Sequence, residues 1–308
     1  MLPSVAVTGA TGFIGGAVVR SLLDNGWHVR ALVRPASFDK PLPAEIERIA
    51  GSLADTASLK ELLRGCGAVV HCAGVVRGVR ASTFMRNNAE TVGRLAQVAS
   101  EEAGVGRFLL VSSLAATRPQ VSPYAASKHA GELALEKAGG EVSWLALRPP
   151  AVYGPGDREL LPLFKVMARG IAPLWGDRDA RFSLIFIADL VSAIDRWLNS
   201  PTPVTGVYEL DDGRNDGYSM DDIADIVAVV AKRPVRRVHV PSALLDVAAA
   251  ANLRLAQIAG YEPMLTPWKL KELRHPRWVC DNRAFTAATG WEPRTSFVEG
   301  LTLALAGH

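Results

Sequence analysis

The chain has 308 residues, of which 49% are apolar and 21% charged, values that are ordinary for a globular protein. They exclude a disordered, collagen-like or coiled-coil chain, and the length is sufficient for one large domain or two unequal ones. The formal charge of +3, from 34 Lys and Arg against 31 Asp and Glu, is spread along the chain, so nucleic acid is not expected as a partner.

The compartment is indicated by the cysteines and by the first residues. The chain has three cysteines, Cys66, Cys72 and Cys280. They are odd in number and have no CxxC spacing, which favours a reducing environment. The opening Met-Leu-Pro-Ser leads directly into an apolar run, without a basic region or a cleavage site. We therefore expect a cytoplasmic protein.

The first half of the chain alternates short apolar runs with helical patterns. The runs have the length and continuity of strands buried on both faces and cover residues 4–8, 28–33, 68–73, 108–112 and 144–147. Helical patterns over 13–25 and 81–102 are long enough to be crossovers between parallel strands. The pattern predicts an α/β fold with a Rossmann-type, doubly wound parallel sheet.

Three glycines follow the first predicted strand. Gly9, Gly12 and Gly15 lie in Thr-Gly-Ala-Thr-Gly-Phe-Ile-Gly, where the strand ends and the first helix begins. Glycines at that place permit a tight turn, the approach of backbone N–H groups to a pyrophosphate, and close helix packing. The motif predicts a dinucleotide site, with a ligand-free glycine turn as the alternative. No Gly-Lys-Ser/Thr follows, which excludes a P-loop.

The second predicted strand runs into Arg34, at the place where an NAD-binding fold usually has an acid for the ribose hydroxyls. The nearest acid, Asp39, comes several residues later and after a proline. A guanidinium suits a 2′-phosphate, so NADP(H) is favoured and NAD(H) is possible. Alternatively, Arg34 is a solvated charge or stacks on adenine.

Three polar residues form a candidate catalytic group. Tyr124 and Lys128 are four residues apart and share one face of a predicted helix. A nearby ammonium would stabilise the tyrosine phenolate and lower its pKa. Ser113 comes just after the strand over 108–112, at the edge of the sheet where ligands bind, and can donate a hydrogen bond to a carbonyl oxygen.

After residue 149 the pattern becomes less regular, with many prolines and glycines. A strand over 183–187, a helix over 189–198 and a strand over 206–210 precede a mainly helical tail over 219–308. We predict a dinucleotide-binding domain over 1–152 plus about 188–212, and a smaller substrate-binding domain over about 153–187 plus 213–308. The apolar stretch 243–258 is interrupted by polar residues, so it predicts a buried or partner-facing helix without stable membrane insertion.

These residues together resemble the extended short-chain dehydrogenase/reductase superfamily, also called the NAD-dependent epimerase/dehydratase family. The resemblance rests on motifs in the family's order: Thr8–Gly15, Ser112-Ser113, Tyr124–Lys128 followed by Glu132, Leu147–Asp157 and Phe186–Leu190. It implies a catalytic triad of Ser113, Tyr124 and Lys128, with Lys128 also on the nicotinamide ribose. With the residues of the glycine turn and Arg34, the expected cofactor contacts are Gly9, Thr11, Gly12, Phe13, Ile14, Arg34, Ser52, Leu53, Ala73, Gly74, Ser112, Tyr124, Lys128, Pro149 and Val152.

Departures from the family's patterns narrow the expected reaction. Leu114–Ala116 stands where 4,6-dehydratases have an Asp-Glu pair, which disfavours dehydration. Ala151 replaces an Asn with which epimerases commonly hold the substrate phosphate, and Arg181 lies one residue away from the family's phosphate-binding Arg. Ser52 stands where the family commonly places Asp against adenine.

The remaining pattern is most similar to the branch of 3β-hydroxysteroid dehydrogenases and dihydroflavonol reductases. It implies an NADP(H)-dependent oxidoreductase that interconverts a ketone and a secondary alcohol on a small, apolar substrate by hydride transfer. A nucleotide-sugar epimerase with tightly bound NAD and a non-catalytic NADP(H)-binding sensor or scaffold are the alternatives. The resemblance also implies a homodimer, and no metal is expected because the His71-Cys72 and His129-Glu132 pairs have no further ligands at suitable spacing.

Overall fold

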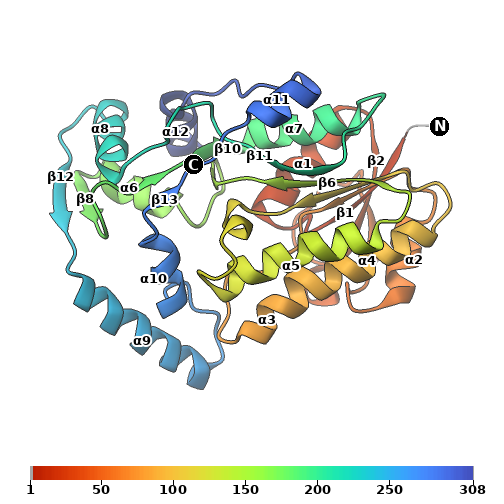
Figure 1. The fold of residues 1–308 in the computed structure, drawn as a ribbon, viewed down its shortest axis with the longest axis horizontal. Helices are drawn as coiled ribbons and strands as arrows, with labels where there is room; N and C mark the ends of the chain where they lie inside the picture. The colour runs from red at the N-terminus through yellow and green to blue at the C-terminus, as the bar shows by residue number, and fades with distance from the viewer. Residues whose placement is uncertain (1–2, 308) are drawn as a thin grey trace.

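The computed structural model describes residues 3–307, and within that range seven parallel strands form a central sheet (Figure 1). In spatial order they are β11 (Gly206–Glu209), β6 (Ser143–Arg148), β5 (Arg107–Val111), β4 (Ala68–His71), β1 (Ser4–Thr8), β2 (His28–Val33) and β3 (Glu47–Ala50). The chain builds outward from β1 to β3 and then returns to the other side of β1 with β4. The predicted Rossmann-type, doubly wound sheet is confirmed.

Helices cover both faces of this sheet (Figure 1). One face is covered by α1 (Phe13–Asp24) and α7 (Ile187–Leu198). The other face is covered by α2 (Thr56–Leu63), α4 (Thr91–Glu101) and α5 (Pro123–Ala138). The side chains of β1 alternate between the two cores. Val5 and Val7 pack with α1, Ala6 packs with α2 and α4, and all three are fully buried. Burial on both faces explains why the strand sequences are almost continuously apolar.

The strands predicted in the first half are present and differ from the predicted ranges only at their ends, whereas β3 was not predicted. β1 and β2 have the predicted bounds, but β4 ends at His71 and β5 at Val111. The backbone N–H of Cys72 still donates to the Thr8 carbonyl at 3.1 Å, after which the chain turns away from β1. The predicted ends at Ala73 and Ser112 were therefore too late, and both residues lie in loops.

The helix predicted over 81–102 is interrupted. α3 (Ala81–Met85) passes into a π-helical turn over Arg86–Glu90, and α4 begins at Thr91. Asn88, inside the π-helical turn, is buried and binds both the loop after β4 and α5. Tertiary hydrogen bonds of this kind stabilise a local widening of the helix that helical propensity does not specify.

The residues after β6 form smaller elements. Three two-stranded parallel pairs are present: β7 (Ala151–Tyr153) with β10 (Leu184–Phe186), β8 (Ile171–Leu174) with β12 (Arg236–His239), and β9 (Arg181–Phe182) with β13 (Arg277–Trp278). The helices are α6 (Leu161–Ala168), α8 (Met220–Val230), α9 (Ser242–Ala259), α10 (Pro267–Leu273), α11 (Arg283–Thr289) and α12 (Phe297–Ala306). Short 3-10 turns cover Pro35–Ser37 and Leu114–Thr117.

Two segments of the second half return to the large sheet. β11 pairs with β6 at the sheet edge, and α7 packs beside α1. The predicted helix over 189–198 begins two residues earlier, at Ile187. The proposed domain boundaries remain a prediction, and residues 1, 2 and 308 of those domains lie outside the described range.

α9 is not the buried helix that its composition suggested. Only Ala249 and Ala256 are buried, whereas Val247 is 67% exposed and Ile258 is 86% exposed. The helix lies at the margin of the molecule, far from the sheet, and its neighbour is α10 (Figure 1). The expectation of burial is therefore wrong, while a partner for α9 remains a prediction. No helix within residues 3–307 has both the length and the apolar character that crossing a bilayer requires.

Candidate active site

The turn between β1 and α1 is in backbone contact with the end of β4. Gly9 has φ +75°, and a Cβ at this position would lie 2.6 Å from the Ala73 backbone nitrogen. A Cβ at Gly15 would overlap the Gly9 carbonyl, so α1 also packs directly on the turn. The conformation and the close contacts both require glycine.

The N-terminus of α1 is open to an anionic ligand. Its N-cap residue, Gly12, has no side chain to accept the free backbone N–H groups, and the first helical turn contains no acidic residue. Free N–H groups and the helix dipole favour phosphate at such a site. The three neighbouring residues Thr11, Phe13 and Ile14 are half-buried. Together with the glycine contacts, this arrangement fits the pyrophosphate of a dinucleotide.

The other predicted cofactor residues also lie at or near the carboxyl edge of the sheet. They follow successive strands: Arg34 after β2, Ser52 and Leu53 after β3, Ala73 and Gly74 after β4, Ser112 after β5, and Pro149 and Val152 after β6. Because parallel strands share one carboxyl edge, the fold places these loops around the glycine turn. The structure thus brings together residues that are more than 140 positions apart in the chain.

Arg34 is available for an additional anion. Its side chain is exposed, and its guanidinium forms no ion pair or hydrogen bond with other residues of the described range 3–307. In the loop after β3, the Ser52 hydroxyl accepts the Ala54 N–H at 3.0 Å. The arrangement leaves a free guanidinium, not a carboxylate, immediately after β2.

Ser113 and Tyr124 lie on two capped segments that meet at this edge. The Ser113 hydroxyl accepts the Ala115 N–H at 3.2 Å at the start of a 3-10 turn. Tyr124 is in the first turn of α5, whose N-cap Ser122 accepts the Ala125 N–H at 3.0 Å. The Ser113 side chain is close enough to the Tyr124 phenol to lower its pKa.

The environment of Tyr124 keeps its phenol protonated. Burial raises the pKa of Tyr124 to about 12, although the hydrogen bond with Ser113 lowers it in part. The carboxylates of Glu272 and Glu159 raise this pKa further. The downward shift of the Tyr124 pKa that the sequence suggested is therefore wrong for this structure.

Lys128 does not act on Tyr124 here because its ammonium is engaged elsewhere. Its Nζ donates to the Val111 carbonyl at 2.7 Å, at the end of β5. Burial lowers the pKa of Lys128 to about 8, and the nearby Glu132 carboxylate opposes that shift. Lys128 is thus still mostly protonated at neutral pH and lies on the same helix as Tyr124, one turn further along.

A buried ion pair connects α5 to the carboxyl ends of β5 and β6. The Arg148 guanidinium donates to both oxygens of Glu132, at 2.9 and 2.6 Å, and the Ser112 hydroxyl donates to the same carboxylate. Glu132 is 4% exposed. Although Ser112 was predicted to line the cofactor, its side chain contacts this ion pair and thereby fixes the end of β5 against α5.

Asn88 is a site residue that the sequence did not reveal. Its Oδ1 accepts the Val75 N–H at 2.8 Å, and its Nδ2 donates to the Val75 carbonyl at 2.9 Å and to Ser127 Oγ at 3.0 Å. These bonds fix the loop after β4 against α5. An isolated Asn in a helical pattern gives no sequence signal for such a role.

Glu272 is a second residue that the sequence did not reveal. It lies on α10, is buried, accepts a hydrogen bond from the Ser122 hydroxyl and pairs with Lys269 Nζ at 2.8 Å. Since Ser122 caps α5, this contact joins the C-terminal part of the chain to the helix of Tyr124. Ser122 and Glu272 are 150 residues apart, so no local spacing in the sequence could indicate their contact.

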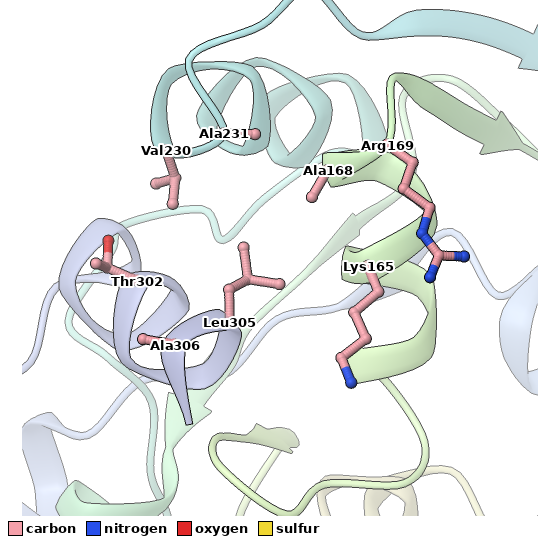
Figure 2. A pocket seen from close by; sticks show the side chains of 8 residues that line it. All are labelled: Lys165, Ala168, Arg169, Val230, Ala231, Thr302, Leu305 and Ala306. Carbon is pink, nitrogen blue, oxygen red and sulfur yellow. The ribbon is translucent and has the colours of Figure 1, made fainter. Parts of the chain in front are cut away.

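Two surface hollows lie away from these residues. One, of about 470 Å³, is formed by α6, α8 and α12, and Figure 2 shows its lining: Lys165, Ala168, Arg169, Val230, Ala231, Thr302, Leu305 and Ala306. The other, of about 510 Å³, lies at the opposite, amino edge of the sheet and includes Ser4 and Ala68. Neither contains a predicted catalytic or cofactor residue. Within 3–307, no three His, Cys, Asp or Glu side chains form a cluster suited to a metal ion.

Comparisons with known proteins match most of the chain. The sequence profile described as the NAD dependent epimerase/dehydratase family matches residues 5–210. A ceramide reductase of Caulobacter vibrioides is 36% identical over 302 residues, which cover 97% of this chain and 92% of that protein. A 2-alkyl-3-oxoalkanoate reductase of Stenotrophomonas maltophilia is 27% identical, covering 96% of this chain and 97% of that protein.

Solved structures agree with the fold. The UDP-glucuronic acid 4-epimerase from Bacillus cereus, in complex with UDP-glucuronic acid and NAD, has a TM-score of 0.75 to this chain. The likeness covers 99% of this chain and 98% of that one, at 20% identity. At this identity the similarity establishes the common architecture and carries no information about substrate.

Proposed function

The chain belongs to the NAD dependent epimerase/dehydratase family of NAD(P)-dependent enzymes, and we propose that it is an NADP(H)-dependent reductase of a ketone on a long-chain, apolar substrate. The observation that carries the proposal is the protonated Tyr124 phenol beside the Ser113 hydroxyl, at the same sheet edge as the glycine turn. This pair can bind and protonate a carbonyl oxygen. The product would be the corresponding secondary alcohol.

Names of two relatives support the substrate class. A ceramide reductase and a 2-alkyl-3-oxoalkanoate reductase both act, by their names, on molecules with alkyl chains, and the second name specifies a ketone. A ceramide is an N-acylated amino alcohol with two long chains, and one of its hydroxyls is the reduced form of a ketone. We therefore replace the expected small substrate by a long-chain one and retain its apolar character.

The chain's own residues have separable roles in this reaction. When bound, the nicotinamide supplies the hydride for reduction or accepts it in the reverse direction. Tyr124 donates its phenolic proton to the carbonyl oxygen, or takes a proton from the alcohol, and Ser113 orients that oxygen. Lys128 would bind the nicotinamide ribose, and the N–H groups at the start of α1 would bind the pyrophosphate.

The nucleotide-sugar alternative has less support. Arg181, near the position where the family's epimerases hold substrate phosphate, donates instead to Asp222 at 2.8 Å. Ala151 offers no polar group at the neighbouring phosphate position. An exchanging reductase should purify without bound nucleotide, oxidise NADPH with long-chain 3-oxo substrates and leave UDP-sugars unchanged. Near-stoichiometric retained NAD together with interconversion of UDP-sugars would replace the reductase by an epimerase.

Cofactor choice gives the first testable prediction. Arg34→Ala removes the free guanidinium proposed to bind the 2′-phosphate, so NADPH affinity should fall about tenfold or more while NADH affinity changes little. Fluorescence titration of both cofactors measures this. Arg64→Ala is the matched control, because Arg64 precedes β4 and lies at the opposite edge of the sheet. Equal weakening of both cofactors by Arg34→Ala would contradict the assignment of NADP(H).

The pH profile gives a second prediction. Lys128 has a pKa of about 8, so its ammonium is present below that pH and is lost as pH rises through it. If the ammonium binds the nicotinamide ribose, kcat/KM for NADPH-dependent reduction should decrease about tenfold for each pH unit above 8. The residual activity of Lys128→Ala should lack this decrease. A wild-type profile that stays flat from pH 7 to pH 10 would argue against this role.

Oligomeric state and compartment are further parts of the proposal. We propose a homodimer in the cytoplasm, as the resemblance and the cysteine pattern imply. Sedimentation of the purified protein tests the dimer, and fractionation of cells that express it tests the compartment.

A further inference from the structure

α9 carries an apolar stripe that faces outward. Six exposed residues, spaced so that they share one side of the helix, form what we call the α9 stripe: Leu244, Val247, Ala248, Ala251, Leu255 and Ile258. The helix has 18 residues and is therefore about 27 Å long. An unbroken apolar surface of this length is unusual on a freely solvated helix.

The rest of α9 is held by the protein, so the stripe is presented in a fixed direction. The opposite side contains the two buried residues of the helix, Ala249 and Ala256, and α10 is the neighbouring helix. Asn252 Nδ2 donates to the Leu265 carbonyl at 2.8 Å, and Arg274 on the α10 side pairs with Asp246 at 2.7 Å. Within residues 3–307, no element covers the stripe.

Positive charge is concentrated in the segment of the chain that contains the stripe. Residues 231–280 contain nine Lys and Arg but three Asp and Glu, a formal charge of +6, whereas the whole chain has +3. Arg254, on α9 itself, and Lys271, on the adjacent α10, are exposed and form no ion pair within the described range. The sequence of α9 alone has too few cations for a membrane-binding helix, but α10 adds the unpaired Lys271. Four other cations of the segment, Arg237, Lys269, Arg274 and Arg277, pair with carboxylates. An apolar surface bordered by cations complements anionic lipid headgroups over acyl chains.

We propose that the α9 stripe docks on the surface of a membrane that contains anionic lipids, with α9 parallel to the bilayer plane. The apolar side chains would enter the acyl boundary, while Arg254 and Lys271 remain at the headgroups. The helix lies on the membrane and does not span it.

This surface is physically connected to the candidate active site. α10, which supports α9, carries Glu272, and Glu272 binds the Ser122 cap of the helix of Tyr124. If the proposed function is right, docking brings the membrane, and a long-chain ketone dissolved in it, to the part of the molecule that supports the Tyr124 helix. This consequence rests on the proposed function, whereas the docking itself does not.

Vesicle flotation of the full chain, without cofactor or substrate, tests the docking. Wild-type protein should float with vesicles of phosphatidylcholine that contain phosphatidylglycerol, and at least about tenfold less with phosphatidylcholine alone. Leu255→Ser with Ile258→Ser should reduce binding to the anionic vesicles about tenfold or more. Val229→Ser with Leu303→Ser, two exposed apolar residues on α8 and α12, is the matched control and should bind like wild type. Arg254→Glu with Lys271→Glu should also reduce binding, without loss of the apolar stripe.

Two results would overturn the docking proposal. One is equal flotation of wild type and the Leu255/Ile258 variant, with circular dichroism showing both folded. The other is a wild-type dimer in sedimentation without vesicles that the same variant converts to monomers, which would assign the stripe to a second copy of the chain. Activity distinguishes the two proposals: flotation without reduction of any ketone rejects the function alone, and reduction of dispersed ketones without flotation rejects the docking alone.

Discussion

Tyr124→Phe is expected to lower kcat for NADPH-dependent reduction about a thousandfold and to leave NADPH affinity unchanged. The substitution removes one hydroxyl, which is the proposed proton donor, while Phe fills nearly the same volume against Phe84. The fold should therefore be preserved. Steady-state kinetics with a long-chain 3-oxo substrate and a fluorescence titration of NADPH measure the two quantities separately.

Two comparisons make this result specific. Tyr208→Phe is the matched control, because Tyr208 lies on β11 and packs with Phe285 away from Ser113. It should keep wild-type kcat. If Tyr124→Phe instead retains full activity with ketones, another group protonates the oxygen and the proposed role of Tyr124 is wrong. If the wild-type protein binds NADPH but turns over no ketone, the non-catalytic sensor becomes the better reading.

Arg148→Ala is expected to lower the free energy of unfolding by about 3–5 kcal/mol. It leaves the Glu132 carboxylate, which is 4% exposed, without its bidentate partner. The remaining hydrogen bond from Ser112 cannot compensate for a buried charge. Urea denaturation at neutral pH measures the loss.

An exposed ion pair provides the comparison for Arg148. Arg237→Ala breaks contacts with Asp221 and Asp225 on the surface of α8 and should cost about 1 kcal/mol or less. The double replacement Arg148→Met with Glu132→Leu should recover much of the stability, because it removes both charges together. A loss near 1 kcal/mol for Arg148→Ala would mean that water reaches Glu132 in the folded protein.

The parts of the fold that the sequence predicted well depend on local pattern. β1 and β2 have the predicted bounds because buried, β-branched runs ended by a glycine or a charged residue define a strand without reference to distant residues. The glycine turn was also predictable from local pattern. Gly15 contacts Gly9, which is close to it in the chain, and the contact of Gly9 with Ala73 follows from the strand order, in which β4 lies beside β1.

The parts that could not be predicted depend on distant partners. The π-helical turn is stabilised by Asn88 bonds to Val75 and Ser127, which helical periodicity does not contain. The direction of the Tyr124 pKa shift depends on burial and on Glu272, and Lys128 binds the Val111 carbonyl instead of acting on the phenol. The apolar composition of α9 is equally compatible with burial and exposure, and only the packing distinguishes them.

The bond between Ser122 and Glu272 also determines when a growing chain can complete this site. The strands β1 to β6 and the residues Ser113 to Lys128 are all synthesised before position 150 and can begin to pair early. The contact of Ser122 needs a residue 150 positions later. During translation, the nucleotide-binding half can therefore assemble on the ribosome well before the Tyr124 helix receives its final support, so cofactor binding should precede catalytic competence in the nascent protein.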